Sequence, residues 1–123
     1  MAHEISLPWP PKELSPNARV HWTKKARSAK AYKEACFWLT KAAGWPNLPT
    51  GYDIPLTVTF HPPDLRRRDD DNFEAAWKCG RDGVAAAWGV DDNRFQVTRA
   101  RGEPVKGGAV IVRINRTSGN TDS

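Results

Sequence analysis

The sequence predicts a small α+β domain in which a mixed β-sheet packs against helices, in the approximate order β-α-β-α-β-β. The length of 123 residues fits one domain, and the hydrophobic fraction of 39% indicates a folded chain. Segments with alternating apolar residues are interleaved with segments whose apolar residues recur every three or four positions. We expect the domain to cover residues 1–116 and the polar tail, residues 117–123, to be disordered.

The first half of the chain predicts a strand, a loop, a helix and a second strand. Residues 4–7 have strand character and end at a proline-rich loop. Residues 23–43 have the period of a surface helix, with lysines and arginines covering much of its surface. Residues 54–61 alternate as a strand. The apolar positions of the predicted helix are Ala26, Ala29, Tyr32, Ala35, Cys36 and Leu39, and those of the second strand are Leu56, Val58 and Phe60.

The second half predicts another helix, a turn and two final strands. The helix covers residues 72–88, although Gly80 and Gly83 each oppose it by about 1 kcal/mol. A turn follows, and residues 95–103 and 109–115 are the expected strands. The apolar stripe of the helix is Phe73, Ala76, Trp77, Val84, Ala87 and Trp88.

The composition favours an anionic partner in a reducing compartment. Nineteen Lys and Arg against fourteen Asp and Glu give a net charge of +5, which favours nucleic acid or an anionic membrane surface as a partner. No apolar run is long enough to span a bilayer, and the first residues lack a secretory pattern. Two cysteines without CxxC spacing are typical of a reduced cytosol. We therefore expect a cytoplasmic protein.

The stretch RRRDDDN, residues 66–72, places three adjacent carboxylates after three arginines. Adjacent charges repel by roughly 1–4 kcal/mol at a protein surface, so either arginines or a divalent cation neutralise them or the segment is loose and solvated. Asp71 with Glu74 also has the form of a capping box at a helix start. The two roles are compatible.

A second acidic pair, Asp91 and Asp92, follows the predicted helix, and taken alone it indicates a turn. If it meets Asp69 and Asp71, the oxygen-only ligands suit Mg²⁺. A helix of about sixteen residues spans roughly 24 Å, so the chain must fold back or a partner subunit must supply one group. The histidines and cysteines show no zinc spacing, and no phosphate-binding glycine motif is present.

Lys78 lies on the same face of the predicted helix as Asp71. A lysine at this place is able to stabilise charge that develops on a phosphate. The alternative is a surface ion pair with Glu74, worth about 0.3–0.5 kcal/mol.

Four motifs, LPWPP, RRRDDDN, GVDDNRF and VKGG, occur in the order and approximate spacing of the RusA-type Holliday-junction resolvases, including phage-borne members. The chain resembles that family over residues 5–114. The resemblance implies a homodimeric, Mg²⁺-dependent endonuclease, with Mn²⁺ as a substitute, that acts in DNA recombination and repair. It would cut four-way or branched DNA by paired symmetric nicks, in the nucleoid of a bacterial or phage-infected cell.

The resemblance places the metal ligands at Asp69, Asp71 and Asp92, with Asp91 as their neighbour. The family has a lysine in a D-N-x-x-K pattern, which falls here on Ala75, and we expect Lys78 to replace it. The DNA-binding residues implied are Arg66, Arg67, Arg68, Lys24, Lys25, Arg27 and Lys106, of which the helical lysines have a solvated helix surface as their alternative.

Six tryptophans are expected mainly in the core or at a dimer interface. Trp9 and Trp22 lie in or beside the loop, where one is able to stack on an unpaired base. The alternative to a nuclease is a protein that binds junctions or branched DNA without cutting, which the missing lysine at Ala75 favours.

Overall fold

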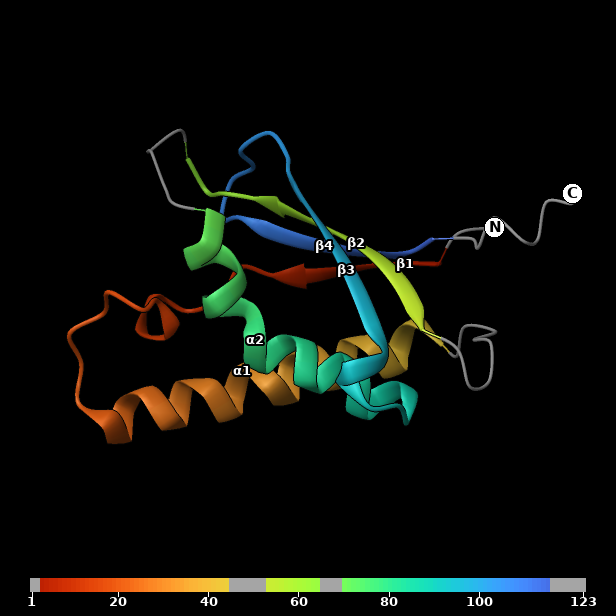
Figure 1. Cartoon of the computed structure of the whole chain (residues 1–123). Coiled ribbons are helices and arrows are strands. Elements are labelled where there is room, and N and C mark those ends of the chain that lie inside the picture. The colour runs from red at the N-terminus through yellow and green to blue at the C-terminus, as the bar shows by residue number, and fades with distance from the viewer. Residues whose placement is uncertain (1–2, 45–52, 65–69, 116–123) are drawn as a thin grey trace, which may run out of the picture.

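The computed structural model describes residues 3–44, 53–64 and 70–115. Four strands form one sheet, and the two long helices lie on one of its faces (Figure 1). The α+β class and the predicted β-α-β-α-β-β order are confirmed. The predicted disordered tail lies outside the described residues. The elements are β1 (His3–Pro8), η1 (Lys12–Leu14), α1 (Trp22–Ala43), β2 (Ile54–His61), α2 (Asp70–Trp88), η2 (Asp92–Arg94), β3 (Phe95–Arg101) and β4 (Ala109–Ile114).

The sheet is mixed, with the strand order β1-β4-β2-β3. β4 is antiparallel to both β1 and β2, whereas β2 and β3 are parallel and are joined through α2. Ile54 pairs with Phe95 at one end of the parallel pair, and Phe60 pairs with Arg101 at the other. β3 is therefore an edge strand that runs beside β2 over its whole length.

The core lies between the helix-covered face of the sheet and the two helices. The predicted inward face of β2 is confirmed, because Leu56, Val58 and Phe60 are all buried. α2 contributes Phe73, Trp77, Val84, Ala87 and Trp88, as its predicted stripe requires, and Ala76 packs against this core while partly exposed. No helix within the described ranges combines the length and the apolar character of a membrane span.

The buried stripe of α1 is narrower than the sequence predicts. Tyr32, Cys36 and Thr40 are buried at four-residue spacing. Thr40 satisfies its hydroxyl group by donating a hydrogen bond to the Cys36 carbonyl oxygen at 2.7 Å. Leu39, predicted as part of the stripe, is 41% exposed because it lies one position off this row, and Ala26 is exposed as well.

The two glycines of α2 mark the place where it contacts α1. A Cβ atom at Gly83 would overlap the backbone carbonyl oxygen of Lys33. A Cβ atom at Gly80 would lie 2.7 Å from the Tyr32 ring. Both positions therefore need glycine so that the helices can approach each other, which outweighs the helix-propensity penalty expected from the sequence.

Candidate functional site

The acidic stretch precedes and opens α2. Arg66, Arg67, Arg68 and Asp69 lie outside the described residues. The backbone of α2 begins at Asp70, so Asp71 lies inside the first helical turn and the capping position lies before it. The predicted capping box, with Asp71 as the cap, is therefore wrong in its position.

The second acidic pair follows the other end of α2, with Asp92 in η2 and Asp91 directly before it. Asp91 caps η2, because its Oδ1 accepts a hydrogen bond from the Asn93 backbone nitrogen at 3.0 Å. The turn interpretation of Asp91 is thus confirmed. Asp92 contacts Arg81 twice, through its backbone oxygen at 3.2 Å from Nη2 and through Oδ2 at 3.9 Å from Nε. Arg81 therefore fixes Asp92 beside the middle of α2.

Asp82 is a further acidic residue beside Asp92, and the sequence analysis did not identify it. Burial raises the pKa of the Asp82 carboxyl group, and the charge of the neighbouring Asp92 carboxylate raises it further. Lys33 and Lys78 act in the opposite direction. The signal in the sequence was the helical spacing, since Asp82 follows Lys78 by four residues on the face that also carries Asp71.

The backbone places Asp71 and Asp92 at opposite ends of the α2–β3 pair. The helix runs antiparallel to the strand, because Arg101 lies over the Phe73 ring and Arg81 lies over the Phe95 ring. The separation of ten positions between Asp71 and Arg81 corresponds to about 15 Å of helix. Among the residues that the structure describes, no three metal-ligating side chains gather at one point. The metal ligand set stays a prediction.

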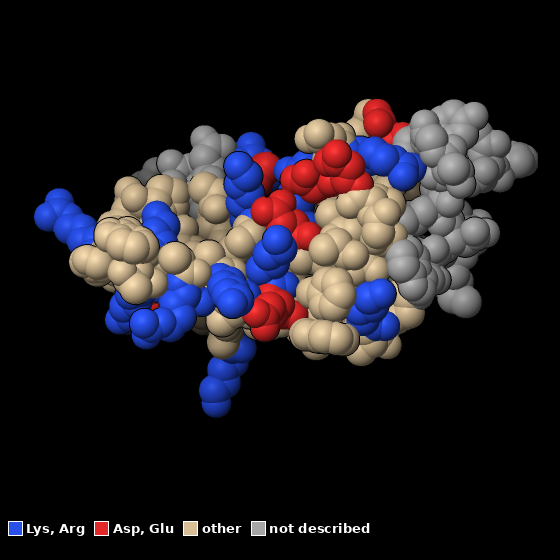
Figure 2. Space-filling model, turned by 90° about the horizontal axis from the view of Figure 1, so that it is seen from below, with Lys and Arg blue, Asp and Glu red and all other residues tan. Residues whose placement is uncertain are grey.

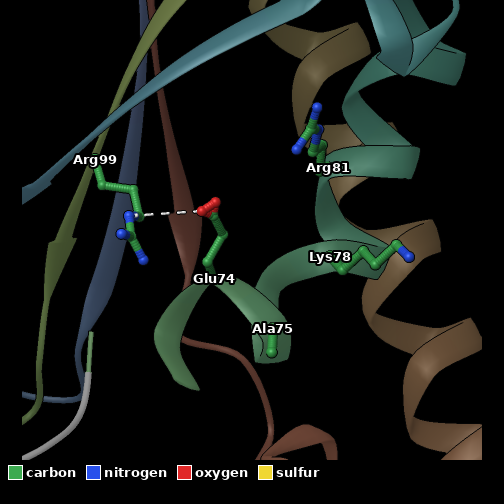
Figure 3. Close-up of a pocket in the computed structure, with 5 residues that line it drawn as sticks. All are labelled: Glu74, Ala75, Lys78, Arg81 and Arg99. Atoms are coloured by element: carbon green, nitrogen blue, oxygen red, sulfur yellow. Dashed lines mark ion pairs between the residues drawn. The ribbon is translucent and has the colours of Figure 1, made fainter. Parts of the chain in front are cut away.

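A cleft of about 330 Å³ separates the exposed side of α2 from β3 (Figure 3). Lys78 and Arg81 line it from the helix, and Arg99 lines it from the strand. Among the described residues, Glu74 is the one acidic residue of the lining, and Ala75 completes it. The wall of the cleft thus carries three cationic side chains and one carboxylate, an arrangement that suits an anion such as a phosphodiester.

The arginines of β3 point toward the helices. In the parallel register, Arg99 pairs with Val58 and Arg101 pairs with Phe60, whose side chains are on the helix-covered face of the sheet. Arg99 Nε lies 3.6 Å from a carboxylate oxygen of Glu74. Both arginines therefore occupy positions on the helix-covered side at the edge of the sheet, and Arg99 reaches the cleft from there.

The predicted ion pair between Glu74 and Lys78 is wrong. Glu74 points toward Arg99 instead, and Lys78 points away from Glu74 (Figure 3). Lys78 and Ala75 line the same cleft from neighbouring turns of α2. A lysine at either position would therefore place its ammonium group beside the same cleft.

The basic residues of α1 form an exposed surface. Lys24, Lys25 and Arg27 all lie on the first turns of the helix and are exposed, and Lys24 Nζ lies 4.0 Å from a carboxylate oxygen of Glu13. Viewed from the helix side, Lys and Arg gather around this end of the molecule, whereas acidic side chains lie nearer its middle (Figure 2). Lys106 is exposed in the turn before β4.

The tryptophans divide between core and surface. Trp77 and Trp88 are buried, as expected. Trp9 packs edge-on against Phe60 and Phe73, with ring centroids 6.4 and 5.2 Å away, so its ring is engaged inside the protein. Trp22, by contrast, is 74% exposed. Of the two candidates for base stacking, only Trp22 is positioned for it.

The cysteines provide no reactive thiolate in this region. Cys36 is fully buried, and burial raises the pKa of its thiol to about 12. Burial also raises the pKa of the Cys79 thiol. Both thiols are therefore protonated at neutral pH, and protonated thiols are poor nucleophiles and metal ligands.

No protein-family model matches the chain. An uncharacterized protein of Xylella fastidiosa (strain Temecula1) is 44% identical to this chain over 93 residues, which cover 74% of this chain. The matched region covers 61% of that relative, so the chain corresponds to about three fifths of the relative's length.

Proposed function

We propose that this chain is a Mg²⁺-dependent, structure-selective endodeoxyribonuclease that resolves four-way DNA junctions by paired nicks. The observation that carries the proposal is the cleft between α2 and β3, whose wall bears Lys78, Arg81 and Arg99. A DNA phosphodiester is anionic and fits such a wall, and Asp92 contacts Arg81, which lines the cleft. The resemblance in motif order to the RusA-type resolvases supports the same function. The place of action would be the nucleoid of a bacterial or phage-infected cell.

Each side chain of the cleft has a distinct role in this proposal. Arg99 and Arg81 bind and orient the phosphate, because a guanidinium group offers paired donors to phosphate oxygens. Glu74 holds Arg99 in place through their ion pair. Lys78 stabilises the negative charge that develops on the phosphate during displacement.

The aspartates that would hold Mg²⁺ are Asp69, Asp71 and Asp92, with Asp91 beside them. The described part of this set fits a hard cation, because Asp92 offers carboxylate oxygens and has the carboxylate of Asp82 as its neighbour. Bound Mg²⁺, or Mn²⁺ in its place, would supply a hydroxide nucleophile at neutral pH and neutralise charge on the phosphate.

The distance between the two acidic groups favours a dimer. Asp71 and Asp92 lie at opposite ends of the α2–β3 pair, so we propose that one subunit supplies Asp69 and Asp71 and its partner supplies Asp92. A two-fold symmetric dimer then contains two equivalent sites. Two sites related by a two-fold axis match a junction that must be cut in two symmetry-related strands.

The second candidate is a protein that binds junctions without cutting them. Ala75 favours it, because the lysine of the resolvase motif is missing at this position. Lys78 argues against it, because its side chain lines the same cleft as Ala75.

Metal removal separates the two candidates. With a synthetic four-way junction in EDTA, we expect binding without cutting, and addition of Mg²⁺ should produce symmetric nicks that leave 5′-phosphates and 3′-hydroxyls. A linear duplex of the same sequence is the control substrate and should stay intact. Junction binding with no nicks after metal addition would support the non-cutting protein and contradict the nuclease.

Exchange of the lysine between two positions tests the role of Lys78. We expect Lys78→Ala to lower the nicking rate about 100-fold, in the range typical of a lost charge-stabilising group, without weakening junction binding to the same degree. The double variant Lys78→Ala, Ala75→Lys should recover much of that rate, because both positions line the same cleft. Unchanged nicking by Lys78→Ala would remove this residue from the mechanism.

A further inference from the structure

The beginning of α1 is unusually open. All residues from 21 to 27 are exposed, and in Figure 1 the first turns of the helix extend beyond the sheet. We call Trp22, Lys24, Lys25 and Arg27 the α1 patch. It combines a largely exposed aromatic ring with three cationic side chains within six consecutive residues.

The α1 patch contributes little to the stability of the isolated chain. A tryptophan that is 74% exposed leaves most of its apolar surface in water. The first turn of α1 has no acidic residue, and cations near a helix start interact unfavourably with the helix dipole. Glu13 offsets this only in part, through one pair with Lys24 at 4.0 Å. The arrangement therefore favours an external anionic partner.

The chemistry of the α1 patch matches a single-stranded nucleic acid. Such strands bind where a basic surface follows the phosphates and an aromatic side chain stacks on a base. The Trp22 ring has the His21 ring beside it, with centroids 5.6 Å apart and planes tilted by 31°. The two rings give an unpaired base an aromatic platform, and the lysines and Arg27 lie close enough in sequence to meet its neighbouring phosphates.

We infer that the α1 patch binds an unpaired nucleotide, with Trp22 stacked on its base and Lys24, Lys25 and Arg27 around its phosphates. The inference rests on the proposed function for its biological substrate, where such a nucleotide would lie at the centre of an opened junction. In this inference, α1 recognises the branch point of the DNA, and the separate cleft between α2 and β3 binds the phosphate that is cut.

Trp38 provides a matched control on the same helix. It is 64% exposed, but its neighbours are Phe37, edge-on with centroids 4.9 Å apart, and the exposed Leu39. The variants Trp22→Ala and Trp38→Ala both remove a surface indole and should leave the fold intact. The probes are a labelled oligo-dT strand and an abasic strand of the same length, with binding followed by fluorescence anisotropy in EDTA.

Trp22→Ala is expected to weaken binding of oligo-dT roughly 5- to 100-fold, the range for loss of one base–aromatic stack. The same variant should bind the abasic strand as the wild type does, since that strand has no base to stack. Trp38→Ala should bind both strands normally. Lys25→Ala should weaken binding of both strands to a similar degree, because it acts on the phosphates.

Three results would overturn the inference. They are unchanged oligo-dT affinity in Trp22→Ala, no binding of either strand by the wild type, and a change of oligomeric mass in Trp22→Ala without a change in DNA affinity. The last result would assign the α1 patch to a protein contact. Mg²⁺-dependent nicking by the wild type tests the proposed function separately. If binding depends on Trp22 but no nicking occurs, this inference is supported and the proposed nuclease activity is contradicted.

Discussion

Two inactive variants, Asp71→Asn and Asp92→Asn, are expected to recover nicking activity when their subunits are combined in one dimer. Each variant alone should bind a four-way junction at least as well as the wild type and should not cut it, because each lacks a proposed metal ligand. In a mixed dimer with sites shared between subunits, one site loses both aspartates and the other keeps both. Random mixing makes half of the dimers mixed, so about a quarter of all sites are intact.

The measurement is the rate of single nicks after the two variants are unfolded together and refolded. The control is a mixture of Asp71→Asn with Asp69→Asn. These two aspartates come from the same subunit in the proposed arrangement, so every site in that mixed dimer is defective and no activity should return. No recovery with Asp92→Asn, in a sample shown to contain mixed dimers, would place the whole site in one subunit. Normal cutting by Asp71→Asn alone would remove that residue from the mechanism.

Alanine at Gly83 is expected to destabilise the protein by about 1–3 kcal/mol, the usual cost of overpacking, despite alanine's better helix propensity. The added Cβ would overlap the Lys33 carbonyl oxygen, and a backbone atom cannot rotate away as a side chain can. α1 and α2 must therefore move apart. The loss should appear in urea unfolding as a lower midpoint with an unchanged slope.

Gly80→Ala is the matched control in the same helix. Its added Cβ would meet side-chain atoms of Tyr32, Trp77 and Cys36 at 2.7 to 3.0 Å, and these can shift more easily than a backbone. We therefore expect a smaller loss than for Gly83→Ala. A gain of about 1 kcal/mol in Gly83→Ala, as helix propensity alone predicts, would contradict the close contact between the helices.

The fold could be predicted from periodicity because most elements have one clear buried face. Residues 54–61 alternate strictly and form β2 with the predicted bounds. The errors arise where a local signal competes with packing. Leu39 is apolar and fits the predicted stripe, yet Thr40 is the buried residue. Thr40 can be buried because its hydroxyl group forms a hydrogen bond within the helix. The glycines of α2 oppose a helix in sequence terms, and only the position of α1 explains them.

The candidate site could be predicted only in its parts. Sequence motifs drew attention to Asp92 and Lys78, and the structure places both near Asp82. The cleft itself could not be foreseen, because it forms only where β3 packs beside α2, and residue spacing does not show which β3 side chains face the helix. Helical spacing also suggested an ion pair between Glu74 and Lys78. Glu74 instead pairs with Arg99 of β3, and this contact cannot be predicted from spacing within the helix. Tertiary pairing decides such contacts.

The inward arginines of β3 restrict how two copies of this chain can associate. An incoming strand that extended the sheet beyond β3 would confine Arg99 and Arg101 under new backbone and strip water from their charges. This border of the molecule is thereby protected against fibril-like stacking. Two copies could still associate through β1, the other edge strand, or through side chains on the helices or the uncovered sheet face.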